Sequence, residues 1–296
     1  DTQSLVPLAG RTALVTGGSR GIGKMIATGF IAQGAKVYIS SRKSDICEAV
    51  AEELGPNCIA MPQDISTVDG CKALAATMAE HESGVDILVN NAGILRDKSF
   101  SKGSIDDFRL VTDVHLMGTV HCTKSYWDIM KEQEYGRIVV TSSSSGLYGN
   151  FGQTNYGAAK MGVIGMMNTL AQEGAKYNVK INALAPTAGT RMTEGLIDEK
   201  AFALFTPETV TPAVLYLVSE DAPTRTILAA GAGAYAVAKI VETEGMWLPE
   251  AEQTPEGIAA HWGQISEGGE RALQAGFEPS IKMIGQAAKG LGLDLS

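Results

Sequence analysis

The first 235 residues alternate short apolar runs with longer segments whose apolar positions recur every three or four residues. Short apolar runs bounded by turn residues are typical of buried strands, and the longer periodicity is typical of helices. Their alternation predicts an α/β fold, a Rossmann-type doubly wound parallel sheet of about seven strands with helices on both faces. The predicted strands are 12–16, 36–40, 57–61, 85–89, 136–141, 179–184 and 226–230, and the predicted helices include 45–54, 68–81, 104–131, 154–176 and 208–219.

The pattern weakens beyond residue 190. Residues 190–206 are predicted to form a loop with short helices, suited to covering a substrate. We therefore expect residues 1–235 to form a dinucleotide-binding and catalytic domain. Residues 236–296, with scattered Trp, Pro and Gly, are expected to form a C-terminal extension packed on that domain.

Composition narrows the function classes. Apolar residues make up 45% of the 296 residues, as in globular proteins, and the net charge of −9 disfavours binding to nucleic acid or to anionic membranes. The longest uncharged apolar run is too short to cross a bilayer, and no signal-peptide pattern is visible. The four cysteines lack metal-ligand spacing, so we expect reduced thiols, no metal site and a cytoplasmic location.

A glycine-rich turn between the first predicted strand and its helix indicates dinucleotide binding. Glycines there permit a tight turn and close backbone approach, and the amides at the helix N-terminus face a pyrophosphate. The spacing is GxxxGxG, within a strand–turn–helix–strand unit of under 35 residues. The candidate cofactor-binding residues of this turn are Gly17, Ser19, Arg20, Gly21, Ile22 and Gly23.

The end of the second predicted strand favours NADP(H) over NAD(H). An acidic residue there would bind a ribose 2′-hydroxyl and repel a 2′-phosphate, but this chain has Ser41 and Arg42. Arg42 and Arg20 could clamp a phosphate between two guanidinium groups. The alternative is that Arg42 is an ordinary solvated charge at a helix start.

Two further stretches follow predicted strands. Small residues at Asn91, Ala92 and Gly93 would let the backbone approach a ligand at the carboxyl ends of the strands. Asp64 could accept a hydrogen bond from an adenine amino group, or equally could cap the next helix.

A hydroxyl, a phenol and an ammonium group are candidates for proton chemistry. Tyr156 and Lys160 are one helical turn apart and leave the same helix face, and Ser143 lies thirteen residues before Tyr156. A cation near a phenol lowers the pKa of the phenol toward neutrality, which would suit Tyr156 to acid–base catalysis. Taken alone, a Tyr and a Lys at this spacing also fit any helix surface.

Together, TGGSRGIG, NNAG, Ser143 with Tyr156-x-x-x-Lys160, and Asn182 before Pro186 resemble the short-chain dehydrogenase/reductase family over about residues 8–235. The resemblance implies that Tyr156 is the general acid/base, that Ser143 orients the carbonyl, and that Lys160 holds the nicotinamide ribose. It also implies that Asp64, Ile65 and residues 91–93 border the adenosine half of the cofactor. Pro186 and Thr187 are expected to contact the cofactor as well, with Pro-Thr replacing the family's usual Pro-Gly.

From about residue 85 the chain looks like the (3R)-hydroxyacyl-CoA dehydrogenase domain of D-bifunctional enzymes of fatty-acid oxidation. The segments that carry this likeness are NNAGILRDKSF, YGRIVVTSSSSGLYGNFGQTNYGAAK and NALAPTAGTRMTE. His115 stands where the broad family usually has an Asn in its proton relay, so a catalytic role for His115 is expected only by position. Residues 8–42, in contrast, look like NADP-dependent 3-oxoacyl reductases.

The sequence therefore predicts an NADP(H)-dependent oxidoreductase that interconverts 3-oxoacyl and (R)-3-hydroxyacyl thioesters, with acyl-CoA as the expected substrate. One alternative is a reductase of non-thioester ketones, and another is a dinucleotide-binding protein without turnover. The small residues of the predicted helix 154–176 suit close helix packing, either across a subunit boundary or on the sheet. We expect a homodimer or homotetramer.

Overall fold

The computed structural model of the protein describes residues 7–187 and 198–295. Contacts within the chain divide it into two compact units, Asp1–Val237 and Ala238–Ser296. The boundary lies close to the predicted one, while the packing of the extension on the first unit stays a prediction. Part of the predicted substrate loop, residues 188–197, lies outside the described residues.

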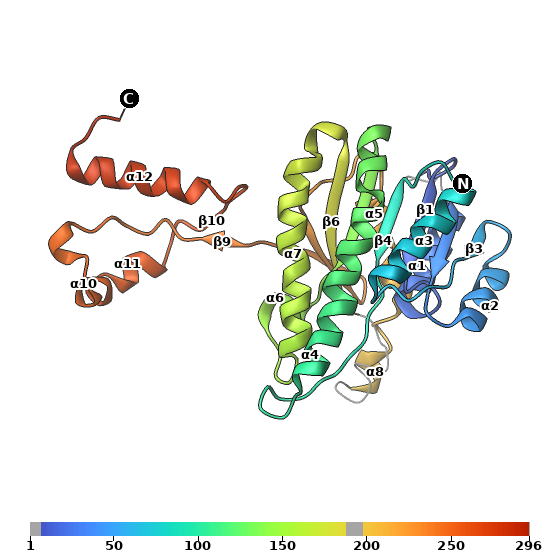
Figure 1. The fold of residues 1–296 in the computed structure, drawn as a ribbon. Helices are drawn as coiled ribbons and strands as arrows, with labels where there is room; N and C mark the ends of the chain where they lie inside the picture. The colour runs from blue at the N-terminus through green and yellow to red at the C-terminus, as the bar shows by residue number, and fades with distance from the viewer. Residues whose placement is uncertain (1–6, 188–197, 296) are drawn as a thin grey trace. The chain divides into compact units, whose positions relative to one another are not determined.

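The first unit is built on one eight-stranded sheet in the order β3-β2-β1-β4-β5-β6-β7-β8 (Figure 1). Every neighbouring pair from β3 to β7 is parallel, as predicted. The strands are β1 (Thr12–Thr16), β2 (Lys36–Ser40), β3 (Cys58–Ala60), β4 (Ile87–Asn90), β5 (Gly136–Thr141), β6 (Val179–Pro186), β7 (Ile227–Gly231) and β8 (Ala234–Ala238).

Strand β8 is the one strand of this sheet that the sequence did not predict. It follows β7 after the two-residue turn Ala232-Gly233, in which both residues have positive φ, 53° and 77°. Two left-handed residues in succession form the type I′ turn typical of a tight hairpin. Its residues, AYAVA, are all apolar and none is buried, so no alternation of apolar and polar positions marked it as a strand.

Helices cover both faces of the sheet. On one face, α1, α2 and α9 pack on alternate strand residues such as Val15, Ile39 and Val89. On the other, α3 packs beside α5, and α7 lies against β5 and β6 (Figure 1). These helices are α1 (Gly21–Ala32), α2 (Ser44–Leu54), α3 (Val68–His81), α5 (Gly118–Gln133), α7 (Thr154–Gly174) and α9 (Thr211–Leu217). Short elements complete the unit: α8 (Glu199–Phe202) and the 3₁₀ turns Ala175–Tyr177 and Pro207–Thr209.

The predicted single helix 104–131 is interrupted. It consists of α4 (Ile105–Thr112), a π-helical segment at Asp113–Met117, and α5. A π segment inserts one extra residue per turn, and such segments are frequent at functional sites. The serine-rich stretch predicted to be a strand end also contains a short helix, α6 (Ser144–Tyr148), capped by the hydroxyl of Ser143.

The second unit contains β9 (Val241–Glu242) paired antiparallel with β10 (Arg271–Ala272), and four helical elements. These are the 3₁₀ turn Glu250–Glu252, α10 (Pro255–Ala260), α11 (Trp262–Ser266) and α12 (Glu278–Leu291). Lys282 of α12 forms an ion pair with Glu242 of β9 at 2.7 Å, which holds the helix to the short ribbon. Among all residues that the structure describes, no helix has the length and apolar character needed to cross a membrane.

Candidate active site

The glycine turn has the backbone geometry of a dinucleotide cradle. Gly17 and Gly21 adopt positive φ values of 65° and 54°, which other residues rarely adopt. A side chain at Gly23 would meet the carbonyl oxygen of Gly17, so only glycine lets the start of α1 close against the end of β1. The amides of the first turn of α1 are thereby left facing the carboxyl edge of the sheet, as pyrophosphate binding requires.

The loop that follows β4 packs directly on this turn. The Thr16 hydroxyl accepts hydrogen bonds from the amides of Asn91, at 3.1 Å, and Ala92, at 3.3 Å. A Cβ on Gly17 would lie 2.9 Å from the Cα of Ala92. Two stretches about 75 residues apart in the sequence therefore form one continuous surface.

The end of β2 lies beside the glycine turn, because Thr16 and Ser40 are partners in the parallel register. The hydroxyl oxygens of Ser40 and Ser41 are buried and have no hydrogen-bond partner in the described part of the chain. Arg20 and Arg42 are both exposed here. Hydroxyl groups without a partner could form hydrogen bonds with a ribose, and the two exposed guanidinium groups could bind a phosphate. Both groups belong to a dinucleotide.

The structure distinguishes the two alternatives for Asp64 in part. The cap of α3 is the Thr67 hydroxyl, which accepts from the amide of Gly70 at 3.0 Å. Asp64 instead accepts from the amide and hydroxyl of Ser66, at 3.0 and 2.6 Å, so it shapes the loop before the helix. The neighbouring Ile65 is buried against Gly118. A contact between Asp64 and an adenine stays a prediction.

Pro186 and Thr187 follow β6 at the same edge of the sheet. The amide of Thr187 donates to the carbonyl of Ala230 at 2.8 Å, which continues the pairing of β6 with β7 for one more residue. A Cβ on Gly231 would lie 2.8 Å from the carbonyl oxygen of Thr187. This close packing fixes the chain just before residues 188–197.

Ser143 is held close to Tyr156 by helix packing. Its hydroxyl accepts from the amide of Gly146 at 3.1 Å, and a Cβ on Gly146 would lie 2.6 Å from the Cβ of Lys160. Glycine at 146 therefore lets α6 lie flush on α7. As a result the Ser143 hydroxyl also reaches Tyr156 and hydrogen-bonds to it.

The pKa of Tyr156 is not lowered as the sequence predicted. Burial of the ring, which is 8% exposed, raises the pKa of Tyr156, and the hydrogen bond from Ser143 only partly opposes this. The negative charge of Asp97 also raises it. The unbound protein therefore keeps Tyr156 as a neutral phenol, the form that donates a proton.

Lys160 lies beneath Tyr156 in an unusual environment. Its ammonium nitrogen is 5.6 Å from the centre of the Tyr156 ring and donates to the carbonyl of Thr141 at 2.8 Å. The residue is 4% exposed, and burial lowers the pKa of Lys160 to about 7. An ammonium group has three N–H donors, so buried Lys160 can take acceptors besides the Thr141 carbonyl, such as the hydroxyls of a ribose.

His115 packs edge-on against Tyr156, with ring centres 5.0 Å apart. Its Nε2 lies 2.6 Å from the carbonyl oxygen and 3.1 Å from the amide nitrogen of Ile94. Because two lone pairs would repel each other at the shorter distance, we assign the proton to Nε2, which donates to the carbonyl oxygen. Nδ1 is then an acceptor, and it is buried without a partner among the described residues. Burial, with the charge of Lys160, lowers the pKa of His115 to about 3, which keeps the imidazole neutral.

Gly93 has a specific reason to be glycine. A side chain there would run into the His115 ring. Ser143, Tyr156, Lys160 and His115 thus meet at one place, next to the Asn91–Gly93 loop. Two residues near this place, Asp97 and Gln153, were not singled out from the sequence. Gln153 lies three positions before Tyr156, and this spacing is the only signal that would have marked it.

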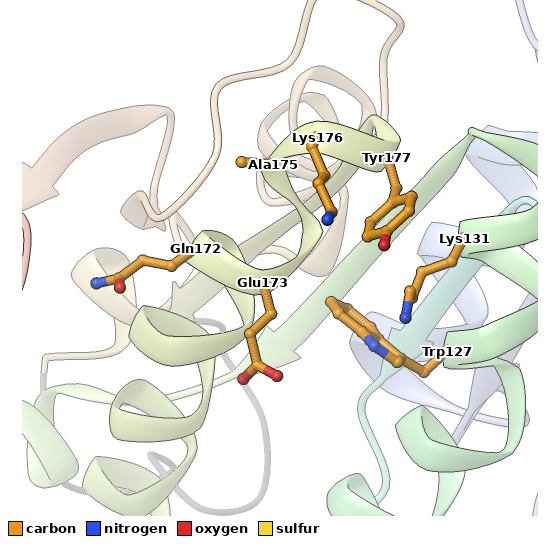
Figure 2. Close-up of a pocket in the computed structure, with 7 residues that line it drawn as sticks. All are labelled: Trp127, Lys131, Gln172, Glu173, Ala175, Lys176 and Tyr177. Atoms are coloured by element: carbon orange, nitrogen blue, oxygen red, sulfur yellow. The ribbon is translucent and has the colours of Figure 1, made fainter.

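A pocket of about 400 Å³ lies elsewhere, between the last turns of α5 and α7 (Figure 2). Figure 2 shows the Tyr177 ring between Lys131 and Lys176, whose ammonium nitrogens are 4.8 and 5.1 Å from the ring centre. These helix ends precede β5 and β6, so the pocket is at the amino edge of the sheet. None of the candidate site residues lines it. The described residues also contain no cluster of three or more His, Cys, Asp or Glu side chains suited to a metal ion.

The chain is similar to several known proteins. The family model for short chain dehydrogenase matches residues 11–201. The chain is 46% identical over 224 residues to peroxisomal multifunctional enzyme type 2 of Drosophila melanogaster, covering 72% of this chain and 37% of that one. It is 38% identical over 229 residues to the 3-oxoacyl-[acyl-carrier-protein] reductase of Synechocystis, covering 74% of this chain and 93% of that protein.

A solved structure of the full-length Drosophila enzyme resembles the model with a TM-score of 0.83 at 36% identity. The match covers 96% of this chain and 50% of that one. The chain therefore spans half or less of the length of the multifunctional enzyme that it matches.

Proposed function

Because the chain belongs to the short-chain dehydrogenase family of oxidoreductases, we propose that it reduces 3-oxoacyl thioesters to (R)-3-hydroxyacyl thioesters, and catalyses the reverse oxidation, with NADP(H). The observation that carries the proposal is the meeting of Ser143, Tyr156 and Lys160 next to the glycine cradle. One relative is named for this substrate class, the 3-oxoacyl-[acyl-carrier-protein] reductase of Synechocystis. Acyl-CoA is the proposed thioester.

The proposed mechanism assigns each side chain one task. When bound, the nicotinamide supplies the hydride that reaches the substrate carbonyl carbon. Ser143 donates a hydrogen bond to the carbonyl oxygen, where negative charge develops. Tyr156 gives its phenolic proton to that oxygen, and the raised pKa of Tyr156 keeps this proton available at neutral pH. Lys160 binds the ribose hydroxyls and favours the phenolate once the proton has left.

His115 acts in this scheme as a neutral acceptor rather than as a titrating acid or base. Its pKa of about 3 keeps it uncharged at any pH where the enzyme would work. Its unpaired Nδ1 suits a hydrogen bond from a water or a hydroxyl group near Lys160. Its Nε2–H meanwhile fixes Ile94, so the ring orients the wall of the site.

The preference for NADP(H) rests on the end of β2. Exposed Arg20, the N-cap residue of α1, and exposed Arg42, two residues after β2, lie in the turns that follow two adjacent strands, and no carboxylate stands at position 41. The remaining candidates, Ser19, Ile22, Asn91 and Gly93, would line the phosphates and the nicotinamide half. A homodimer or homotetramer and a cytoplasmic location stay predictions, and the multifunctional relatives are named peroxisomal.

The experiment that tests this proposal measures NADPH oxidation with 3-oxoacyl-CoA substrates of increasing chain length, beside ketones without a thioester. We expect turnover with the thioesters and a lower kcat/KM with the free ketones. Equal or faster turnover of free ketones would favour the alternative of a general carbonyl reductase. Tight NADPH binding with no turnover of any carbonyl would favour a non-catalytic dinucleotide-binding protein.

A further inference from the structure

Residues 94–103 form a strap that connects the loop after β4 to α4 (Figure 1). Its first residue, Ile94, is held by the imidazole that packs edge-on against Tyr156. Two residues later, the carbonyl of Arg96 accepts from the side chain of Asn155, the neighbour of Tyr156, at 3.1 Å. The strap therefore starts at the proposed catalytic cluster and continues from there as a largely exposed segment.

The second half of the strap folds into a compact turn. The amides of Lys102 and Gly103 both donate to the carbonyl of Ser99, at 3.0 and 2.9 Å. A Cβ on Gly103 would lie 3.9 Å from the Cβ of Lys98, so the chain comes back to the place where the turn began. The amide of Lys98 donates to the carbonyl of Gly152 at 3.0 Å, which ties this turn to the loop before α7. Lys98 and Lys102 thus lie at the two ends of one anchored turn.

The strap carries three exposed cations, Arg96, Lys98 and Lys102. None of them forms an ion pair with any residue that the structure describes. The guanidinium group of Arg96 donates to the carbonyl of the preceding residue at 2.7 Å. The one acid of the strap, Asp97, accepts from the side-chain amide of Gln153 at 3.2 Å. The two ammonium groups are therefore available to an anionic ligand.

Exposed aromatic rings accompany these cations. Phe100, within the turn, is 69% exposed, and Phe151, beside the anchoring Gly152, is 93% exposed. Tyr148, at the end of α6, is 74% exposed. Gly149 and Gly152 adopt positive φ values of 83° and 84°, so the chain turns sharply on both sides of Phe151. Large rings gathered on two loops that are hydrogen-bonded to each other are typical of a surface that a ligand covers.

We propose that the strap, together with the Phe151 loop (residues 149–152), binds the phosphates and the adenine of the CoA carrier; this inference rests on the proposed function. Lysine ammonium groups bind phosphates as point charges, and an exposed aromatic ring can stack on an adenine. The pantetheine arm separates these groups of CoA from the thioester, so their binding site has to lie at the rim of the active site. The strap meets this condition, because it starts beside Tyr156 and ends in an exposed turn.

The charges around the strap determine which effect to expect. Asp106 and Asp107 follow it directly, in the first turn of α4, and the whole chain has a net charge of −9. The proposed site therefore holds CoA by individual contacts rather than by long-range attraction. Neither Lys98 nor Lys102 belongs to the proton-transfer cluster. Their removal should thus raise KM for a CoA thioester and leave kcat almost unchanged.

The test uses the full chain and two thioesters with the same reacting carbonyl. Acetoacetyl-CoA contains the phosphates and the adenine, whereas acetoacetyl-N-acetylcysteamine ends before them. In Lys98→Gln/Lys102→Gln we expect KM for acetoacetyl-CoA to rise by about five- to twentyfold, and KM for the short thioester to stay at the wild-type value. Lys72→Gln/Lys124→Gln, at exposed positions on α3 and α5, removes the same charge and should behave like wild type.

A second variant tests the aromatic part of the site. In Phe151→Ser we expect weaker inhibition by CoA and by 3′-dephospho-CoA, with inhibition by pantetheine unchanged. Unchanged Tm and NADPH affinity would show that the variants fold.

Three outcomes would overturn the inference and leave the proposed function intact. The first is an unchanged KM for acetoacetyl-CoA in the double lysine variant, and the second is an equal rise in KM for both thioesters. The third is a loss in that variant only with acetoacetyl-acyl-carrier-protein, which would assign the strap to a protein carrier. If wild type reduced none of these thioesters, the proposed function would fail, and this inference with it.

Discussion

The cofactor cradle and the proton-transfer cluster lie side by side on one sheet edge but are built in different ways. The cradle is made of backbone, with Gly17 and Gly23 packed where no side chain fits, and its charged groups, Arg20 and Arg42, are exposed. The cluster is made of buried side chains, since Tyr156, Lys160 and His115 are each less than 10% exposed. Adding atoms to the cradle should therefore weaken cofactor binding, whereas removing functional groups from the cluster should slow proton transfer.

The difference also separates two kinds of electrostatics. Exposed guanidinium groups select an anionic ligand by attraction and by hydrogen bonds. In the cluster, burial is the leading influence on the pKa of Tyr156, of Lys160 and of His115. A cofactor that covers this cluster brings hydroxyls to Lys160, so binding and proton transfer are expected to be coupled there.

The largest effect is expected from removing the proton donor of the cluster. Tyr156→Phe keeps the ring but not the hydroxyl, so kcat should fall by about 10²- to 10⁴-fold, while NADPH affinity changes little. Steady-state kinetics and fluorescence titration of NADPH measure the two quantities. Tyr216→Phe, at a half-exposed position on α9, is the matched control and should be near wild type. Near-normal turnover in Tyr156→Phe would remove Tyr156 from the mechanism.

The next largest effect is expected from adding one carbon to the cradle. In Gly23→Ala the new methyl group meets the carbonyl oxygen of Gly17, so we expect NADPH affinity to fall by roughly tenfold or more. Gly165→Ala on α7 has open space for its methyl group and should leave affinity unchanged. Wild-type NADPH affinity in Gly23→Ala would show that the turn does not hold the cofactor.

A smaller effect separates the two cofactors. Ser41→Asp places a carboxylate beside Arg42, where it repels a 2′-phosphate and can accept from a 2′-hydroxyl. The ratio of kcat/KM for NADPH to that for NADH should fall by about tenfold or more. Asp at the exposed Ser44, the first residue of α2, adds the same charge three residues later and tests for a general charge effect. An unchanged ratio in Ser41→Asp would contradict the assignment of the phosphate to Arg20 and Arg42.

The smallest effect is on stability. The pKa of Lys160 is about 7 in the folded protein, below its ordinary value of 10.5, so the unfolded chain binds more protons between these values. The free-energy cost of burying the charged Lys160 ammonium is complete below pH 7 and disappears as pH rises toward 10.5. The free energy of unfolding of wild type should thus increase from pH 7 to 10 relative to Lys160→Met. Urea denaturation without cofactor measures this free energy at each pH, and Lys72→Met, at an exposed position, is the control. If wild type and Lys160→Met showed the same dependence on pH, Lys160 would not be a buried residue with a lowered pKa.

The order of the main strands and the cradle could be predicted from the sequence, because both depend on local signals: short apolar runs, periodic helices and closely spaced glycines. The sheet register then brought Ser41 beside Gly17 without further information. The interruption at Asp113–Met117 could not be predicted, because one inserted residue hardly disturbs a helical pattern. The direction predicted for the pKa of Tyr156 was wrong, because burial raises this pKa, and the burial depends on how α6 and α7 pack in the folded chain. Strand β8 was missed because its residues are all apolar, with no alternation of apolar and polar positions.

The central claim is that hydride reaches the carbonyl carbon of a 3-oxoacyl thioester beside Tyr156. The most direct measurement incubates the protein with acetoacetyl-CoA and NADPH that carries deuterium at the transferring position of nicotinamide C4. We predict (R)-3-hydroxybutyryl-CoA with deuterium at C3, seen by mass spectrometry and chiral analysis, and almost none with Tyr156→Phe. An unlabelled product, or no product from wild type that binds NADPH, would contradict the account.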